Sequence, residues 1–165
     1  MRFRIGDIFE IPLPDTRKGY VHYLYKDKNY LHLIQVLDCF TSGDSNLEIN
    51  RLKKSKPLFP PVFTVLNNAV KDENWKVIGN LPVENFTFPN FLNTAYYFTG
   101  KAGTWYLYDG DKDIPIGRLL PEEYKKLEFC MVYAASNIVQ RIMTGIKPLE
   151  DLINSNRTEN PNPIA

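Results

Sequence analysis

Histidine and cysteine, the side chains best suited to zinc binding and to nucleophilic chemistry, are few in this sequence, and their spacing brings no site together. The candidates are two histidines and two cysteines, His22, His32, Cys39 and Cys130. Four such ligands would suffice for a tetrahedral zinc site. If a turn over residues 26–29 pairs two strands, however, His22 and His32 fall on opposite faces of the sheet, because successive residues of a strand alternate. Cys39 is separated from His32 by an odd number of positions and also lies opposite it. We therefore predict neither a metal site nor a cofactor.

Three aspartates form the next candidate site, and they resemble the start of a calcium-binding loop: Asp109, Asp111 and Asp113. Such a loop requires glycine at its sixth position and glutamate at its twelfth, where this sequence has Ile114 and Leu120. We interpret the aspartates as the charged tip of a hairpin. The sequence also lacks a glycine-rich phosphate loop, a dinucleotide fingerprint and a local nucleophile signature. We expect a protein that is not an enzyme.

The charge balance argues against direct binding to nucleic acid. The 165 residues include 20 basic and 19 acidic side chains, for a net charge of +1, whereas nucleic-acid binders carry a clear basic excess. One local basic cluster is interpreted as a solvated loop: Arg51, Lys53, Lys54 and Lys56. No apolar run approaches the roughly 20 residues that a membrane helix needs, and the start lacks the apolar stretch of a signal peptide. These features predict a cytoplasmic protein with reduced thiols and no membrane contact.

The elements expected to position these residues are mostly strands, rich in aromatic and β-branched residues. We predict strands over 3–13, 20–25, 30–40, 62–66, 75–79, 95–99 and 129–134, with a hairpin joining 105–108 to 116–119. A helix is expected to begin near Pro121, and a second, capped by Ser136, should end at Gly145. The fold class is α+β, with a strongly bent antiparallel sheet or a small SH3-like barrel followed by a C-terminal helix. We expect one domain over residues 1–153 and a flexible tail over 154–165.

Several segments, in this order, resemble the immunity protein 26 family of bacterial polymorphic toxin systems. The resemblance spans roughly residues 4–145 and is carried by Gly6 to Asp15 (GDIFEIPLPD), Trp75 to Pro82 (WKVIGNLP), Pro89, Trp105 to Tyr108 (WYLY), Ile116 to Leu119 (IGRL) and the helix around Arg141. It implies a non-enzymatic protein that binds and neutralises a cognate toxin. It indicates no contact residues and no oligomeric state.

Candidate contact residues come instead from the predicted loops, where binding residues concentrate. The first group lies in the first turn and contains Asp15, Arg17 and Tyr20. The second is the acidic hairpin tip of Asp109, Asp111 and Asp113, which would steer a basic partner.

Two other classes of protein remain open. The Gly6-Asp7-Ile8 start is also similar to that of the MazF and PemK ribonuclease toxins, although an Arg-Pro pair in the second strand and a basic groove are missing. The third possibility is an SH3-like adaptor that binds a peptide.

Overall fold

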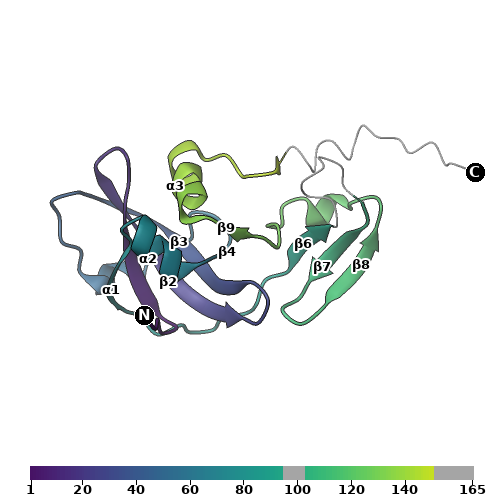
Figure 1. Ribbon diagram of the computed structural model, residues 1–165, viewed down its shortest axis with the longest axis horizontal. Helices are drawn as coiled ribbons and strands as arrows, with labels where there is room; N and C mark the ends of the chain where they lie inside the picture. The colour runs from purple at the N-terminus through teal and green to yellow at the C-terminus, as the bar shows by residue number, and fades with distance from the viewer. Residues whose placement is uncertain (95–102, 151–165) are drawn as a thin grey trace, which may run out of the picture. The chain divides into compact units, whose positions relative to one another are not determined.

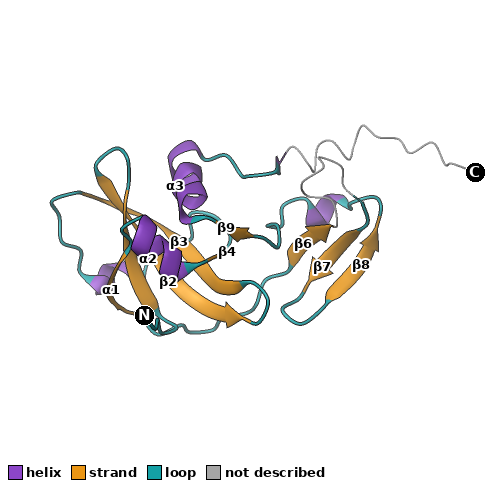
Figure 2. Ribbon diagram, in the orientation of Figure 1, coloured by secondary structure: helices purple, strands orange, loops and turns teal. Residues whose placement is uncertain are grey.

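The computed structural model describes residues 1–94 and 103–150, and strands make up most of its regular structure (Figure 2). The chain divides into two compact units. The first contains residues 1–87 and 131–145, and the second contains residues 88–130 and the segment that follows residue 145. Because each unit has its own sheet, the two are described separately.

The first unit is built on a six-stranded mixed sheet with the order β5-β1-β2-β3-β4-β9 (Figure 1). Its neighbours pair antiparallel except β4 and β9, which are parallel. The strands are β1 (Asp7–Pro12), β2 (Arg17–Asp27), β3 (Leu31–Ser42), β4 (Val62–Thr64), β5 (Lys76–Asn80) and β9 (Val132–Tyr133).

Alternation along the strands gives this sheet two buried faces. On one face Phe9 pairs with Val21, which pairs with Val36, and all three belong to the larger hydrophobic core. On the other face lie Ile8 and Tyr20, which belong to a smaller core cluster. Strands covered on both sides are apolar at successive positions, which explains the Ile8-Phe9 pair in β1.

Short helices and loops cover the two faces. The larger core includes residues of α2 (Leu66–Asp72) and α3 (Ala135–Thr144), whereas Ile49 and Leu52 of α1 (Ile49–Leu52) pack on the smaller one. Helix α3 ends at Gly145, whose φ of +71° is the left-handed conformation that terminates many helices. None of the described helices is long and apolar enough to span a membrane.

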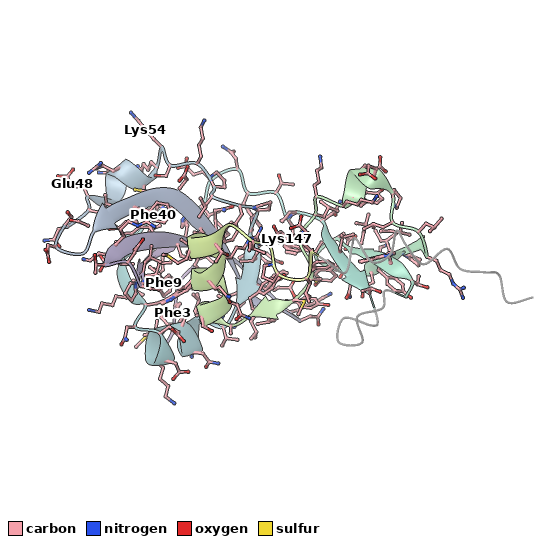
Figure 3. The ribbon with its side chains drawn as sticks, turned by 90° about the horizontal axis from the view of Figure 1, so that it is seen from above. Phe3, Phe9, Phe40, Glu48, Lys54 and Lys147 are labelled. Carbon is pink, nitrogen blue, oxygen red and sulfur yellow. The ribbon has the colours of Figure 1, made fainter. Side chains whose placement is uncertain are left out.

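The second unit contains a three-stranded antiparallel sheet with the order β6-β7-β8. Its strands are β6 (Phe91–Thr94), β7 (Trp105–Tyr108) and β8 (Asp113–Gly117). A 3-10 turn, η2 (Glu122–Tyr124), follows the sheet. The rings of Trp105 and Phe129 stack in the core with centroids 6.4 Å apart, and the ammonium group of Lys147, labelled in Figure 3, lies 5.1 Å from the centre of the Phe129 ring.

The structure confirms the α+β class and the C-terminal helix ending at Gly145. The sheet does not close into a barrel, because β5 and β9 lie at opposite edges of its strand order. The pairing of β4 with β9 also makes it mixed rather than wholly antiparallel. The predicted hairpin forms, with β7 at the predicted residues and with β8 beginning at Asp113, three residues before the predicted start.

Several predicted elements differ from those observed. Only the turn η2 forms after Pro121, and α3 begins at Ala135 with no side-chain cap from Ser136. Helices α1 and α2 were not predicted, since both are too short for a helical period to stand out in the sequence. The strand predicted over 95–99, the end of the 1–153 domain and the tail over 154–165 lie outside the described residues.

Candidate functional site

The two histidines lie on opposite faces of the first sheet, as predicted. His22 pairs with Ile8 and Gln35, and its Nε2 lies 2.8 Å from the Leu81 carbonyl oxygen. His32 packs its ring edge-on against Tyr23, with centroids 5.3 Å apart. The pairing register differs from the one assumed, because the turn is closed by Asp27 and Leu31 rather than by Tyr25 and Tyr30, and a bulge follows between Tyr23 and Tyr25. In the described part of the chain, no three His, Cys, Asp or Glu residues come together where they could hold a metal ion.

Burial lowers the pKa of both histidines. For His22 the burial of the ring outweighs its contact with the Leu81 carbonyl, which favours the protonated form. For His32 burial is again the largest cause, and the charge of Lys26 acts in the same direction, against the smaller opposing effect of the Thr64 carbonyl. Both rings therefore favour the neutral state in the folded protein.

The first-turn residues form a self-contained ion pair. Arg17 donates from Nε to Oδ2 of Asp15 over 2.6 Å, and its guanidinium lies 4.8 Å from the centre of the Phe40 ring. Desolvation raises the pKa of Asp15, but the hydrogen bonds and charge of Arg17 outweigh it, so the net shift is downward. Tyr20 is fully buried, with its hydroxyl 2.6 Å from Oγ1 of Thr41. The side chain of Tyr20 is therefore part of the core and is not displayed to a partner.

The acidic tip lies in the other compact unit, at the turn between β7 and β8. Oδ1 of Asp109 accepts hydrogen bonds from the backbone N–H groups of Asp111 and Lys112, each over 2.9 Å. These bonds lower the pKa of Asp109, with that from Lys112 the largest cause. Asp111 and Asp113 are exposed, and Asp113 accepts a hydrogen bond from Asn93. The tip is thus an ordered, acidic turn.

A different surface of the first unit combines a concave shape with charge of one sign. It is a recess of about 720 Å³, which we call the N-terminal recess. Its lining comes from residues 1–5, from Tyr23 and Lys26 of β2, from Leu31 and His32 of β3, and from Val65 and Asn67.

Hydrogen bonds around Gly6 and Asp7 hold the segment that forms one wall of this recess. Gly6 donates its N–H to the Tyr23 carbonyl and accepts from the N–H of Leu81, both over 2.8 Å. The Asp7 carboxylate accepts from the N–H of Arg4 over 2.8 Å and from Nδ2 of Asn80 over 2.9 Å. Three of these bonds tie the start of β1 and the residue before it to β2 and to the end of β5, and the bond from Arg4 folds the segment onto itself. The Gly6-Asp7 pair, prominent in the sequence, therefore has a structural role.

Aromatic contacts support the inner side of the wall. The ring of Phe3 meets that of Phe9 edge-on, with centroids 5.2 Å apart, and both side chains are labelled in Figure 3. Phe9 is fully buried in the larger core. Phe3 thus anchors the segment while Arg2, Arg4 and Ile5 remain exposed.

The lining of the N-terminal recess is cationic and apolar. Arg2, Arg4 and Lys26 line it, and in the described ranges no carboxylate does. The Nε of Arg4 lies 4.0 Å from the Asp7 carboxylate, whereas among the described residues neither Arg2 nor Lys26 forms an ion pair. Between these cations, Ile5 is 50% exposed and Leu31 is 39% exposed.

A second recess of about 320 Å³ lies between α2, β4 and the start of α3. Asp72 and Glu73 contribute its charged side chains, so it is acidic where the N-terminal recess is basic. Both recesses include Val65 in their lining. The first unit therefore carries concave surfaces of opposite sign next to the same β4–α2 connection.

Neither recess was predicted from the sequence. The residues of the N-terminal recess come from four separate segments, which local motifs do not connect. One signal was present in the sequence: Arg2 and Arg4 alternate with Phe3 and Ile5, so that a strand-like segment there has cations on one side and apolar residues on the other.

Comparison with protein families finds that the family described as Immunity protein 26 matches residues 4–93, more than half of the chain. The matched region contains β1 to β5, all but the last residue of β6, the Gly6-Asp7 pair and most of the N-terminal recess. The sequence resemblance extended further, to about residue 145. No curated protein and no solved structure matches the chain.

Proposed function

The chain belongs to the immunity protein 26 family, and from that premise we propose that it protects a bacterial cell by binding and neutralising a cognate toxin protein. The family match is the observation that carries this proposal. Neutralisation would be stoichiometric, since an immunity protein needs affinity for its toxin rather than a reaction of its own. We expect the two proteins to meet in the cytoplasm, as the sequence predicts.

The disposition of the reactive side chains is in keeping with a binding role. His22 and His32 lie on opposite faces of one sheet, and each ring lies near a backbone carbonyl. Cys39 and Cys130 form no disulfide and belong to different compact units. General acid–base or nucleophilic chemistry would need such groups within hydrogen-bonding reach of one another.

A stable complex with a toxin would bury on the order of 1,600 Å² in total. We propose that the first turn, with Asp15 and Arg17, and the acidic tip, with Asp109, Asp111 and Asp113, contribute contacts. The acidic tip would accelerate the approach of a basic toxin through long-range attraction. Because so large an area needs several loops, no single one of these residues should be indispensable.

Co-expression with the cognate toxin, to be sought among the products of the neighbouring genes, tests the proposal. We expect cells that carry both proteins to grow, cells that carry the toxin alone to die, and the purified proteins to form a complex on size-exclusion chromatography. Growth arrest despite co-expression, with no complex formed, would contradict the proposal. Degradation of RNA by the purified protein would instead support the ribonuclease alternative.

A further inference from the structure

We propose that the N-terminal recess is the surface on which the toxin docks, and that it receives an acidic segment of the toxin carrying an exposed apolar side chain. This inference rests on the proposed function and adds to it the site and the chemistry of the contact. It is independent of the acidic tip, which lies in the other compact unit.

The positive charge of the recess favours a bound segment that is negatively charged. Arg2, Arg4 and Lys26 point to one concavity of about 720 Å³, and among the described residues no carboxylate shares its lining. The whole chain is nearly neutral at +1, so this excess is local. Opposite charges in a partner would gain from all three cations at once, whereas a basic segment would be repelled.

Arg2 and Lys26 are available to pair with a carboxylate of a partner, whereas Arg17 of the first turn is already paired. The guanidinium of Arg17 already pairs with the Asp15 carboxylate and lies over the Phe40 ring. In the described ranges Arg2 and Lys26 have no such carboxylate. A partner carboxylate would therefore form a new ion pair with them without first breaking an existing one.

Exposed apolar side chains lie among these cations and would be covered by an apolar side chain of the partner. Met1, Ile5 and Leu31 are 86%, 50% and 39% exposed, and all three line the recess. The centre of a protein interface is usually apolar, with charges toward its rim. A side chain such as leucine or phenylalanine, flanked by Asp or Glu, matches this pattern.

The aromatic rings of the recess favour a protein segment over single-stranded RNA. Binding of bases requires exposed aromatic faces on which they can stack. Phe3 is half-buried with its ring against Phe9, and Tyr23 and His32 meet each other edge-on. The recess thus offers aliphatic contacts and cations rather than stacking platforms.

The wall of the recess is pre-organised, which lowers the entropy lost on binding. Three hydrogen bonds of Gly6 and Asp7 hold the segment to β2 and to the end of β5, and a fourth, from the N–H of Arg4 to Asp7, lies within the segment. The Phe3–Phe9 contact fixes it from the inside.

Charge reversal in the recess tests the electrostatic half of the proposal. The variant combines Arg2→Glu with Lys26→Glu, and its matched control combines Arg51→Glu with Lys53→Glu. The control changes the same residue types at exposed positions of the first unit, outside the recess. The affinities for the purified toxin and for a labelled peptide of alternating Glu and Leu are measured at low and at physiological salt.

We expect the recess variant to bind both ligands about tenfold more weakly than wild type, since two exposed attractions become repulsions. The control should retain the wild-type affinity, and the difference should shrink as salt rises. For the apolar half, Ile5→Ser should weaken binding, whereas Val77→Ser, at a position 45% exposed outside the recess, should not.

The outcomes separate this inference from the proposed function. If wild type binds the toxin and the recess variant binds it equally well, the docking site is wrong while the immunity function stands. If wild type does not bind the toxin at all, the proposed function fails and this inference falls with it. Loss of binding in the control variant to the same degree, or tighter binding of single-stranded RNA than of the acidic peptide, would also overturn the inference.

Discussion

Gly6 is the position where a single added methyl group should damage the first unit most. Its φ is +95°, which side chains with a Cβ rarely adopt, and an added Cβ would lie 2.6 Å from the Leu81 carbonyl oxygen. Neither atom can move without disturbing the hydrogen bonds of Gly6 with Tyr23 and Leu81. Gly6→Ala should therefore combine backbone strain with the loss of these contacts.

The magnitude can be worked out by comparison with Gly145, which also has positive φ, +71°, and belongs to the same compact unit. At Gly145 nothing lies within 4 Å of an added Cβ, so Gly145→Ala carries only the conformational cost, about 1–2 kcal/mol. Gly6→Ala adds the weakening of the bonds to Tyr23 and Leu81, each about 1 kcal/mol net. We expect a loss of about 3–4 kcal/mol for Gly6→Ala, a large share of the roughly 5–15 kcal/mol by which an ordinary domain is stable.

Urea unfolding followed by circular dichroism measures both variants against wild type. The expected result is a clearly lower midpoint for Gly6→Ala than for Gly145→Ala, at a similar dependence of the unfolding free energy on urea. Equal losses in the two variants would refute the reasoning, because positive φ alone would then account for both. A folded Gly6→Ala protein with intact toxin binding but lower stability would confirm that the residue is structural.

Three further predictions concern other described residues. Because the pKa values of His22 and His32 are lowered in the folded protein, the unfolded chain binds protons first as the pH drops. The stability should therefore fall as the pH drops from above 6.5, the ordinary histidine value, toward the lower folded pKa values. Urea unfolding at pH 7.5 and 5.5 should show this fall, and a variant with both histidines changed to glutamine should show little of this pH dependence. Asp109→Ala should speed hydrogen exchange at the two amides that Asp109 caps, whereas Asp109→Asn, which keeps an acceptor oxygen, should not; identical exchange in both variants would contradict the capping role. Thr64→Val should cost about 1–3 kcal/mol in urea unfolding, because the buried Thr64 hydroxyl donates to the Tyr133 carbonyl over 2.8 Å and links β4 to β9; Thr64→Ser, which keeps the hydroxyl, should retain more of this stability.

Local patterns in the sequence were sufficient for most of the strands and for the class of the fold. Alternation and aromatic content marked β2 and β3, the Asp-Gly turn marked the hairpin of β7 and β8, and Gly145 marked the end of α3. The opposite placement of His22 and His32 also followed from the two-residue period of a strand. The assumed register was wrong, but a strand shift of two residues near His22 preserves the face on which a side chain lies.

Tertiary structure alone decided where the surface charges gather and which candidates are accessible. Tyr20, at the start of the strand predicted over 20–25, was a candidate contact of the first turn, but β2 begins already at Arg17 and places Tyr20 inside the smaller core. Arg2, Lys26, Leu31 and Val65 share a recess only because β2, β3 and the β4–α2 connection meet beside the N-terminal segment. Short-range periodicity follows from backbone geometry and is encoded locally, whereas a concave surface depends on contacts between segments far apart in the chain, which no local pattern specifies.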